Sequence, residues 1–167
     1  MLFYILLAVV SLFVILAQGS FFSFFLVGQY QPDVLLIIVV IVGFLLREKK
    51  GAAIGLCLGL MQDLVFVHTL GIFALPKMLL GFAAGLVGRE IYRSRVSNAL
   101  MLVFTGTIIH EFLVFALVYL FGGALNFEWI MFKQFAIRAA YNSLLALVLY
   151  PFLFWLLREK NILSAED

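Results

Sequence analysis

The sequence predicts an all-α integral membrane protein, with six transmembrane helices in a single polytopic domain over residues 1–167. Composition is the first indication: 66% of the residues are hydrophobic and the mean hydropathy is +1.20. Only 12% are charged, whereas a soluble domain carries about 25%. The other indications are six apolar stretches and a one-sided distribution of basic residues. This length leaves no room for a separate soluble domain.

The six apolar stretches are the predicted spans. A helix needs about 20 residues to cross about 30 Å of hydrocarbon. The first stretch lacks a basic amino-terminal region, so we interpret it as an uncleaved span, either one helix or broken near Gly19. The second begins at Asp33, which with the preceding Pro32 suits the first turn of a helix. The second and third are short and must borrow flanking residues, tilt less or thin the bilayer. In order, the stretches run over 2–26, 33–46, 51–67, 70–88, 97–122 and 130–157.

Basic residues collect in alternate connections. The intervening loops, at 29–31, 68–69 and 122–128, contain no Lys or Arg. Because basic residues flank spans on the cytoplasmic side, six spans with both termini cytoplasmic satisfy this bias at every loop. The basic residues on the predicted cytoplasmic side are eight of the 11 in the chain: Arg47, Lys49, Lys50, Arg89, Arg93, Arg95, Arg158 and Lys160.

Glycines recur every four residues in the third and fourth predicted spans. The two sets are Gly51, Gly55 and Gly59, and then Gly81 and Gly85. Residues four apart share one helix face, and small residues let helix backbones approach closely in lipid. These spans therefore form the expected packing centre. We expect leucine at Gly55 or Gly81 to destabilise the protein more than leucine at Gly88, which lies nearer the end of its span.

Each glycine set is accompanied by one charged residue at membrane depth, Asp63 and Lys77. Both lie at similar distances from the turn at Thr69, so a hairpin would bring them to comparable depth. We expect them to form an ion pair, because a lone charge inside a membrane is costly. Gln62 can add hydrogen bonds. The pair either locks the fold or shapes a functional site.

A second polar set lies on the last two predicted spans. Glu111 and Arg138 reach comparable depth if these spans are antiparallel, which predicts a second ion pair. His110, although adjacent to Glu111, points about 100° away from it on a helix. The set either braces the fold or lines a polar cavity open to the outer face. Its members are Thr107, Glu111, Gln134, Arg138 and Asn142.

The sequence contains no signature of catalysis or of a cofactor. It has no P-loop, no HExxH and no CxxC, and its serines have no general base at a useful spacing. Two histidines and a single cysteine, far apart, make no metal site. We therefore expect no catalytic residue, no metal, no cofactor and no nucleic-acid partner.

The hairpin from Gly51 to Gly88 resembles the hallmark segment of the MreD family of bacterial rod shape-determining membrane proteins. That segment has a glycine-spaced span ending in G-L-x-Q-D, a short turn with L-G, then A-L-x-K and a second glycine-spaced span. The chain departs from it mildly, with a proline before the lysine. A preceding P-D pair also matches. The matching residues are Pro32, Asp33, Gly59, Leu60, Gln62, Asp63, Leu70, Gly71, Ala74, Leu75, Lys77 and Gly81.

The resemblance implies a non-enzymatic scaffold of the elongasome, in the bacterial cytoplasmic (inner) membrane, that supports lateral-wall peptidoglycan synthesis. It implies binding to the bitopic protein MreC. Through MreC it implies links to MreB, a RodA-type glycosyltransferase and a penicillin-binding transpeptidase. The implied fold is similar to that of substrate-binding subunits of energy-coupling-factor transporters. The alternative function is therefore a vitamin-binding or small-molecule-binding transporter subunit, although the first span lacks an in-register Ala-x-x-x-Ala contact motif.

Overall fold

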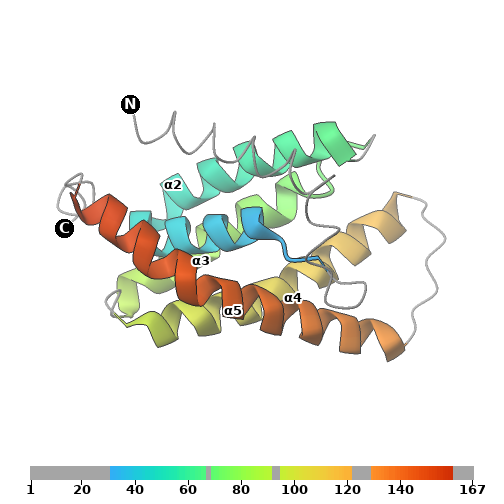
Figure 1. The fold of residues 1–167 in the computed structure, drawn as a ribbon. Helices are drawn as coiled ribbons and strands as arrows, with labels where there is room; N and C mark the ends of the chain where they lie inside the picture. The colour runs from blue at the N-terminus through green and yellow to red at the C-terminus, as the bar shows by residue number, and fades with distance from the viewer. Residues whose placement is uncertain (1–30, 67–68, 92–94, 122–128, 160–167) are drawn as a thin grey trace.

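The computed structural model describes residues 31–66, 69–91, 95–121 and 129–159, all organised around long helices (Figure 1). The first predicted span, 2–26, lies outside the described residues. The helices are α2 (Val34–Phe66), α3 (Ala74–Glu90), α4 (Val96–Leu120) and α5 (Trp129–Glu159).

Helix α2 is two helical arms joined by an abrupt reversal at Arg47. Arg47 has φ 68° and ψ 172°, which is not helical. A Cβ built on Gly51 would lie 2.7 Å from the Cα of Gly43. In one straight helix these residues would be about 12 Å apart, since each residue rises about 1.5 Å. The arms, 34–46 and 48–66, therefore run back along each other, and Figure 1 shows this reversal.

The first arm of α2 is the centre of the protein. Every residue from Leu35 to Leu46 is buried, and a helix that is apolar all round belongs in a core. The ring of Phe44 lies 6.4 Å from that of Tyr150 on α5. Val40 faces Gly106 on α4. This arm therefore contacts both later helices as well as its own second arm.

The predicted glycine faces meet backbone to backbone. A Cβ on Gly51 would contact the carbonyl oxygen of Gly81, and one on Gly55 would contact that of Lys77. Gly59 packs in the same way against Ala74. Helix α3 thus runs antiparallel to the second arm of α2 with no side chains between them, as the spacing predicts.

The carboxyl-terminal half of α3 packs as closely as the rest. A Cβ on Gly85 would meet the backbone at Arg47 and Glu48, and one on Gly88 would meet the carbonyl oxygen of Phe44. The reason for expecting Gly88 to tolerate leucine better than Gly55 or Gly81 therefore does not hold. Helix α3 also contacts the reversal of α2, which helix periodicity alone does not reveal. The relative stability of the three leucine variants stays a prediction.

Helices α4 and α5 are antiparallel neighbours (Figure 1), joined by side-chain contacts from Ser143–Leu100 to Arg138–Glu111. Within the described residues, Val96–Leu120 and Ile130–Arg158 are the two helices long and apolar enough to cross a membrane. Many of their large apolar side chains are exposed, as a lipid-facing surface requires. The count of six spans and the cytoplasmic position of both termini stay predictions.

Candidate functional site

The turn between α2 and α3 is organised by the carboxylate of Asp63. Asp63 is fully buried near the end of α2. Its oxygens accept hydrogen bonds from the backbone N–H groups of Gly71 at 2.7 Å, Phe73 at 2.8 Å and Ala74 at 3.2 Å. The first N–H groups of a helix have no partner within it, and a negative charge there is stabilised by the helix dipole. Asp63 therefore caps α3 from the preceding helix.

Gly71 makes this cap possible. Its φ is +104°, in the region where a glycine avoids the steric cost that other residues meet. That conformation accompanies a turn in which three nearby N–H groups face a single carboxylate. The L-G and Q-D parts of the motif are thus two sides of one turn, joined by hydrogen bonds.

Lys77 is paired with Asp33, not with Asp63. Its Nζ lies 2.6 Å from Oδ2 of Asp33 and donates to Oε1 of Gln62 at 2.5 Å. It also lies 5.5 Å from the centroid of the Phe73 ring, within reach of a cation–π contact. The predicted Asp63–Lys77 ion pair is wrong, because the carboxylate of Asp63 is hydrogen-bonded to the N–H groups of the turn. The buried ammonium is instead compensated by the residue just before the first arm of α2.

Asp33 is the centre of a hydrogen-bond and ion-pair network that reaches four helices. Its Oδ1 accepts the N–H of Leu36 at 2.9 Å and so caps the first arm of α2. Its own N–H donates to Oδ1 of Asn142 on α5 at 3.0 Å. Asn142 in turn donates to Oγ1 of Thr107 on α4 at 3.1 Å. With Lys77 on α3, one aspartate therefore connects the starts of two helices to the middle of two others.

The predicted Glu111–Arg138 pair is present, with Nη1 of Arg138 2.9 Å from Oε2 of Glu111. Of the predicted stripe on α5, Arg138 and Asn142 reach the polar region. Gln134, one turn earlier, is half-buried and is not among the residues that line the pocket described next. The antiparallel arrangement of α4 and α5 therefore brings together four of the five residues of this set.

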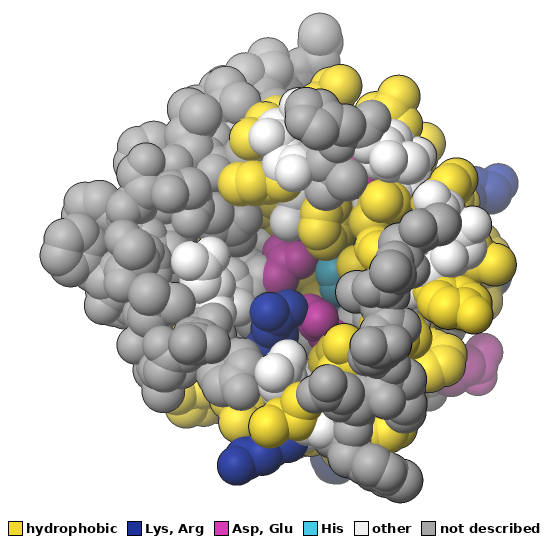
Figure 2. All heavy atoms as spheres, turned by 90° about the vertical axis from the view of Figure 1, so that its right-hand side faces the viewer, with side chains coloured by type: hydrophobic (Ala, Val, Ile, Leu, Met, Phe, Trp, Pro, Cys, Tyr) yellow, Lys and Arg dark blue, Asp and Glu magenta, His cyan; other side chains and the backbone are white. Residues whose placement is uncertain are grey.

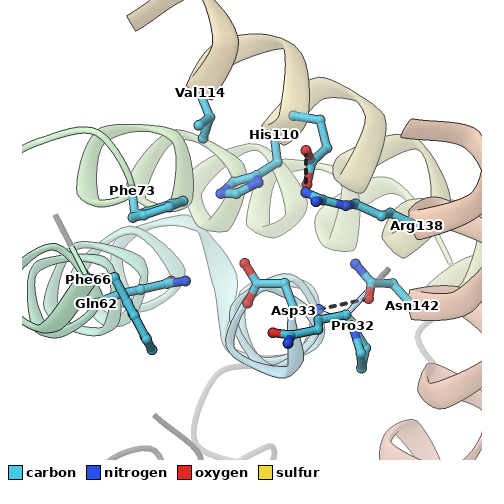
Figure 3. A pocket seen from close by; sticks show the side chains of 11 residues that line it. Pro32, Asp33, Gln62, Phe66, Phe73, His110, Val114, Arg138 and Asn142 are labelled. Atoms are coloured by element: carbon cyan, nitrogen blue, oxygen red, sulfur yellow. Dashed lines mark hydrogen bonds and ion pairs between the residues drawn. The ribbon is translucent and has the colours of Figure 1, made fainter. Parts of the chain in front are cut away.

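These groups surround a pocket of about 290 Å³. Figure 3 shows His110, Arg138, Asp33 and Gln62 converging on a common space from three helices and the residues just before α2. Figure 2 shows acidic, basic and histidine side chains in a hollow at one end of the bundle, with hydrophobic side chains around it. The lining residues are Gln31, Pro32, Asp33, Gln62, Phe66, Phe73, His110, Glu111, Val114, Arg138 and Asn142.

Asp33 and His110 are the two ionisable residues of the pocket lining that are not among the predicted site residues. The sequence indicates for Asp33 a place at the start of a helix and in the P-D pair of the motif, but no contact with Lys77. His110 was considered only with Glu111, from which it points away. Its ring instead lies against Phe73, with the centroids 6.2 Å apart. Sequence spacing could not show this contact, because it joins α4 to the turn before α3.

The residues around the pocket offer hydrogen-bond donors and acceptors, and the charged side chains among them are already in ion pairs. Within the described residues, no three His, Cys, Asp or Glu side chains are placed to hold a metal ion. The chemistry that these residues support directly is recognition and mutual fixation of helices.

Comparison with known families gives a match that covers residues 1–160 of the 167. The matching family is described as rod shape-determining protein MreD. No match to the chain was found among curated proteins or among solved structures.

Proposed function

Because the chain belongs to the MreD family of rod shape-determining proteins, we propose that it is a non-enzymatic membrane scaffold of the cell-elongation complex. In this role it binds an MreC-type bitopic protein and supports lateral-wall peptidoglycan synthesis. The links to MreB, a RodA-type glycosyltransferase and a penicillin-binding transpeptidase are indirect, through that partner. The chain acts in the bacterial inner membrane, with six spans and both termini cytoplasmic.

The contacts that the motif residues make within the protein are the main support for the proposal. The carboxylate of Asp63 is hydrogen-bonded to the turn, the charge of Lys77 is compensated by Asp33, and the glycines pack against the backbone of neighbouring helices. Residues whose polar groups and packing faces are satisfied within the protein fix the relative positions of its helices. A rigid bundle with apolar outer faces on α4 and α5 suits a protein that works by holding others in place within the bilayer.

Depletion tests the role in cell shape. In the rod-shaped bacterium that encodes the chain, depletion should produce rounded cells, and re-expression should restore rods. A Gly51→Leu variant places a side chain against the backbone of α3 and should fail to restore them. Thr105→Val, a matched control on α4 whose hydroxyl bonds only to its own helix, should restore them. Unchanged rods after depletion would overturn the role.

Cysteine labelling tests the topology. The chain has a single cysteine, Cys57, which is exposed, and Cys57→Ala gives a cysteine-free background. A membrane-impermeant thiol reagent should then label Thr69→Cys in intact cells, but Lys49→Cys only after the cells are permeabilised. The reverse pattern would contradict cytoplasmic termini.

A further inference from the structure

His110 is a buried polar side chain that has no hydrogen-bond partner among the residues that the structure describes. It is 2% exposed, and this holds for both Nδ1 and Nε2. Nearly all buried polar groups in proteins are hydrogen-bonded, so one that is not calls for an explanation. The ring lines the pocket and points into it (Figure 3). Nε of Arg138, also buried and also lining the pocket, is likewise unpartnered.

Among the described residues that line the pocket, every charge is paired. The carboxylates of Asp33 and Glu111 are held by Lys77 and Arg138 respectively. A charged ligand would have to break one of these pairs or enter a low-dielectric site without a counter-ion, and either is costly. The pocket therefore selects against net charge.

The spare capacity consists of uncharged hydrogen-bonding groups beside aromatic rings. A neutral imidazole offers one donor and one acceptor, and Nε of Arg138 offers a further donor. Phe66 and Phe73 supply apolar walls. A volume of about 290 Å³ equals that of about ten water molecules at about 30 Å³ each, which is the scale of one sugar ring.

We propose that this pocket binds an uncharged, hydroxylated ring of the size of a single sugar, with His110 and Arg138 as its hydrogen-bonding partners and Phe73 against its apolar face. The ring is either a free sugar or the head group of a glycolipid. This ligand site is separate from the partner binding proposed above and does not depend on it.

The melting temperature of the full chain tests the proposal. The chain is purified in a polyoxyethylene detergent, because sugar-headed detergents would compete for the pocket. At about ten times its dissociation constant, N-acetylglucosamine should raise the melting temperature by about 3 °C. Glucosamine and glucuronate, which have the same ring but carry a charge, should give no rise. For the lipid source, nanodiscs containing a monoglucosyl diacylglycerol are compared with phosphatidylcholine nanodiscs.

Variants connect any shift to the pocket. His110→Phe keeps an aromatic ring but removes both nitrogens and should abolish the shift, whereas Thr105→Val should keep it in full. If His110→Phe does not fold, His110→Gln replaces it and should reduce the shift by half or more. A shift with the glycolipid alone supports a lipid head group, and one with the free sugar supports a soluble ligand. No shift with either, equal shifts with the charged sugars, or a full shift in the His110 variant would overturn the proposal.

Discussion

Removing Lys77 should cost the protein much more stability than removing Lys77 and Asp33 together. The ammonium is fully buried and lies 2.6 Å from the carboxylate. Lys77→Met leaves that carboxylate without its counter-ion, and breaking a buried pair from one side costs about 3–5 kcal/mol. Replacing both members by uncharged groups is often close to neutral. Asn at position 33 can still cap α2 through its amide oxygen.

The coupling between the two sites follows from these values. Lys77→Met and Asp33→Asn in one chain should be more stable than the sum of the single losses, by about 2–4 kcal/mol. The control is a second double-mutant cycle that combines Lys77→Met with Asp63→Asn. Asp63→Asn removes a carboxylate of equal size from the cap of α3. Asp63 bonds to Gly71, Phe73 and Ala74 rather than to Lys77. Its coupling to Lys77 should therefore be smaller than that of Asp33, because the two side chains are connected only through Phe73.

Equilibrium unfolding gives the free energy of unfolding of each variant in the two double-mutant cycles. Full-length variants are titrated with sodium dodecyl sulfate in mixed micelles, and tryptophan fluorescence follows the loss of structure. Strong coupling between positions 63 and 77, with additive losses at 33 and 77, would refute the assignment of the ion pair.

Two further predictions concern the backbone. Gly51→Ala should destabilise by about 1–3 kcal/mol, because the added methyl group meets the backbone of Gly43 and Gly81, and no side chain can move aside. Its control, Gly106→Ala, places the methyl group 3.5 Å from a side-chain carbon of Val40 and should change stability by less than about 1 kcal/mol; equal losses would contradict the close packing. Arg47→Gly should stabilise by about 1 kcal/mol, since φ 68° with ψ 172° is strained for any residue but glycine. A lowered melting temperature for Arg47→Gly would show that the arginine side chain outweighs this strain.

Features that depend on one helix or on one antiparallel pair could be predicted from the sequence. The four-residue spacing of Gly51 and Gly55 places both on one helix face, whichever element packs against that face. The depths of Glu111 and Arg138 follow from the order of α4 and α5. Both predictions agree with the structure, because each requires only the helix period and the direction of the chain.

Features that depend on how three or more elements pack could not be predicted. Asp63 and Lys77 lie at similar depth, but depth does not fix the direction in which a side chain points around its helix. Asp63 points to the turn, and the partner of Lys77 is Asp33, which precedes the first arm of α2. The pocket at His110 forms where residues of α2, α4, α5 and the turn before α3 meet. No spacing along one segment encodes that convergence.

A chain that works by assembly with other membrane proteins, rather than by chemistry of its own, should retain a partner when it is isolated. The most direct measurement is affinity purification of the tagged full-length chain, in mild detergent, from the bacterium that encodes it. An MreC-type bitopic protein should copurify with the wild-type chain and be lost with Gly51→Leu. Purification of a folded wild-type chain without such a partner would contradict the proposed role.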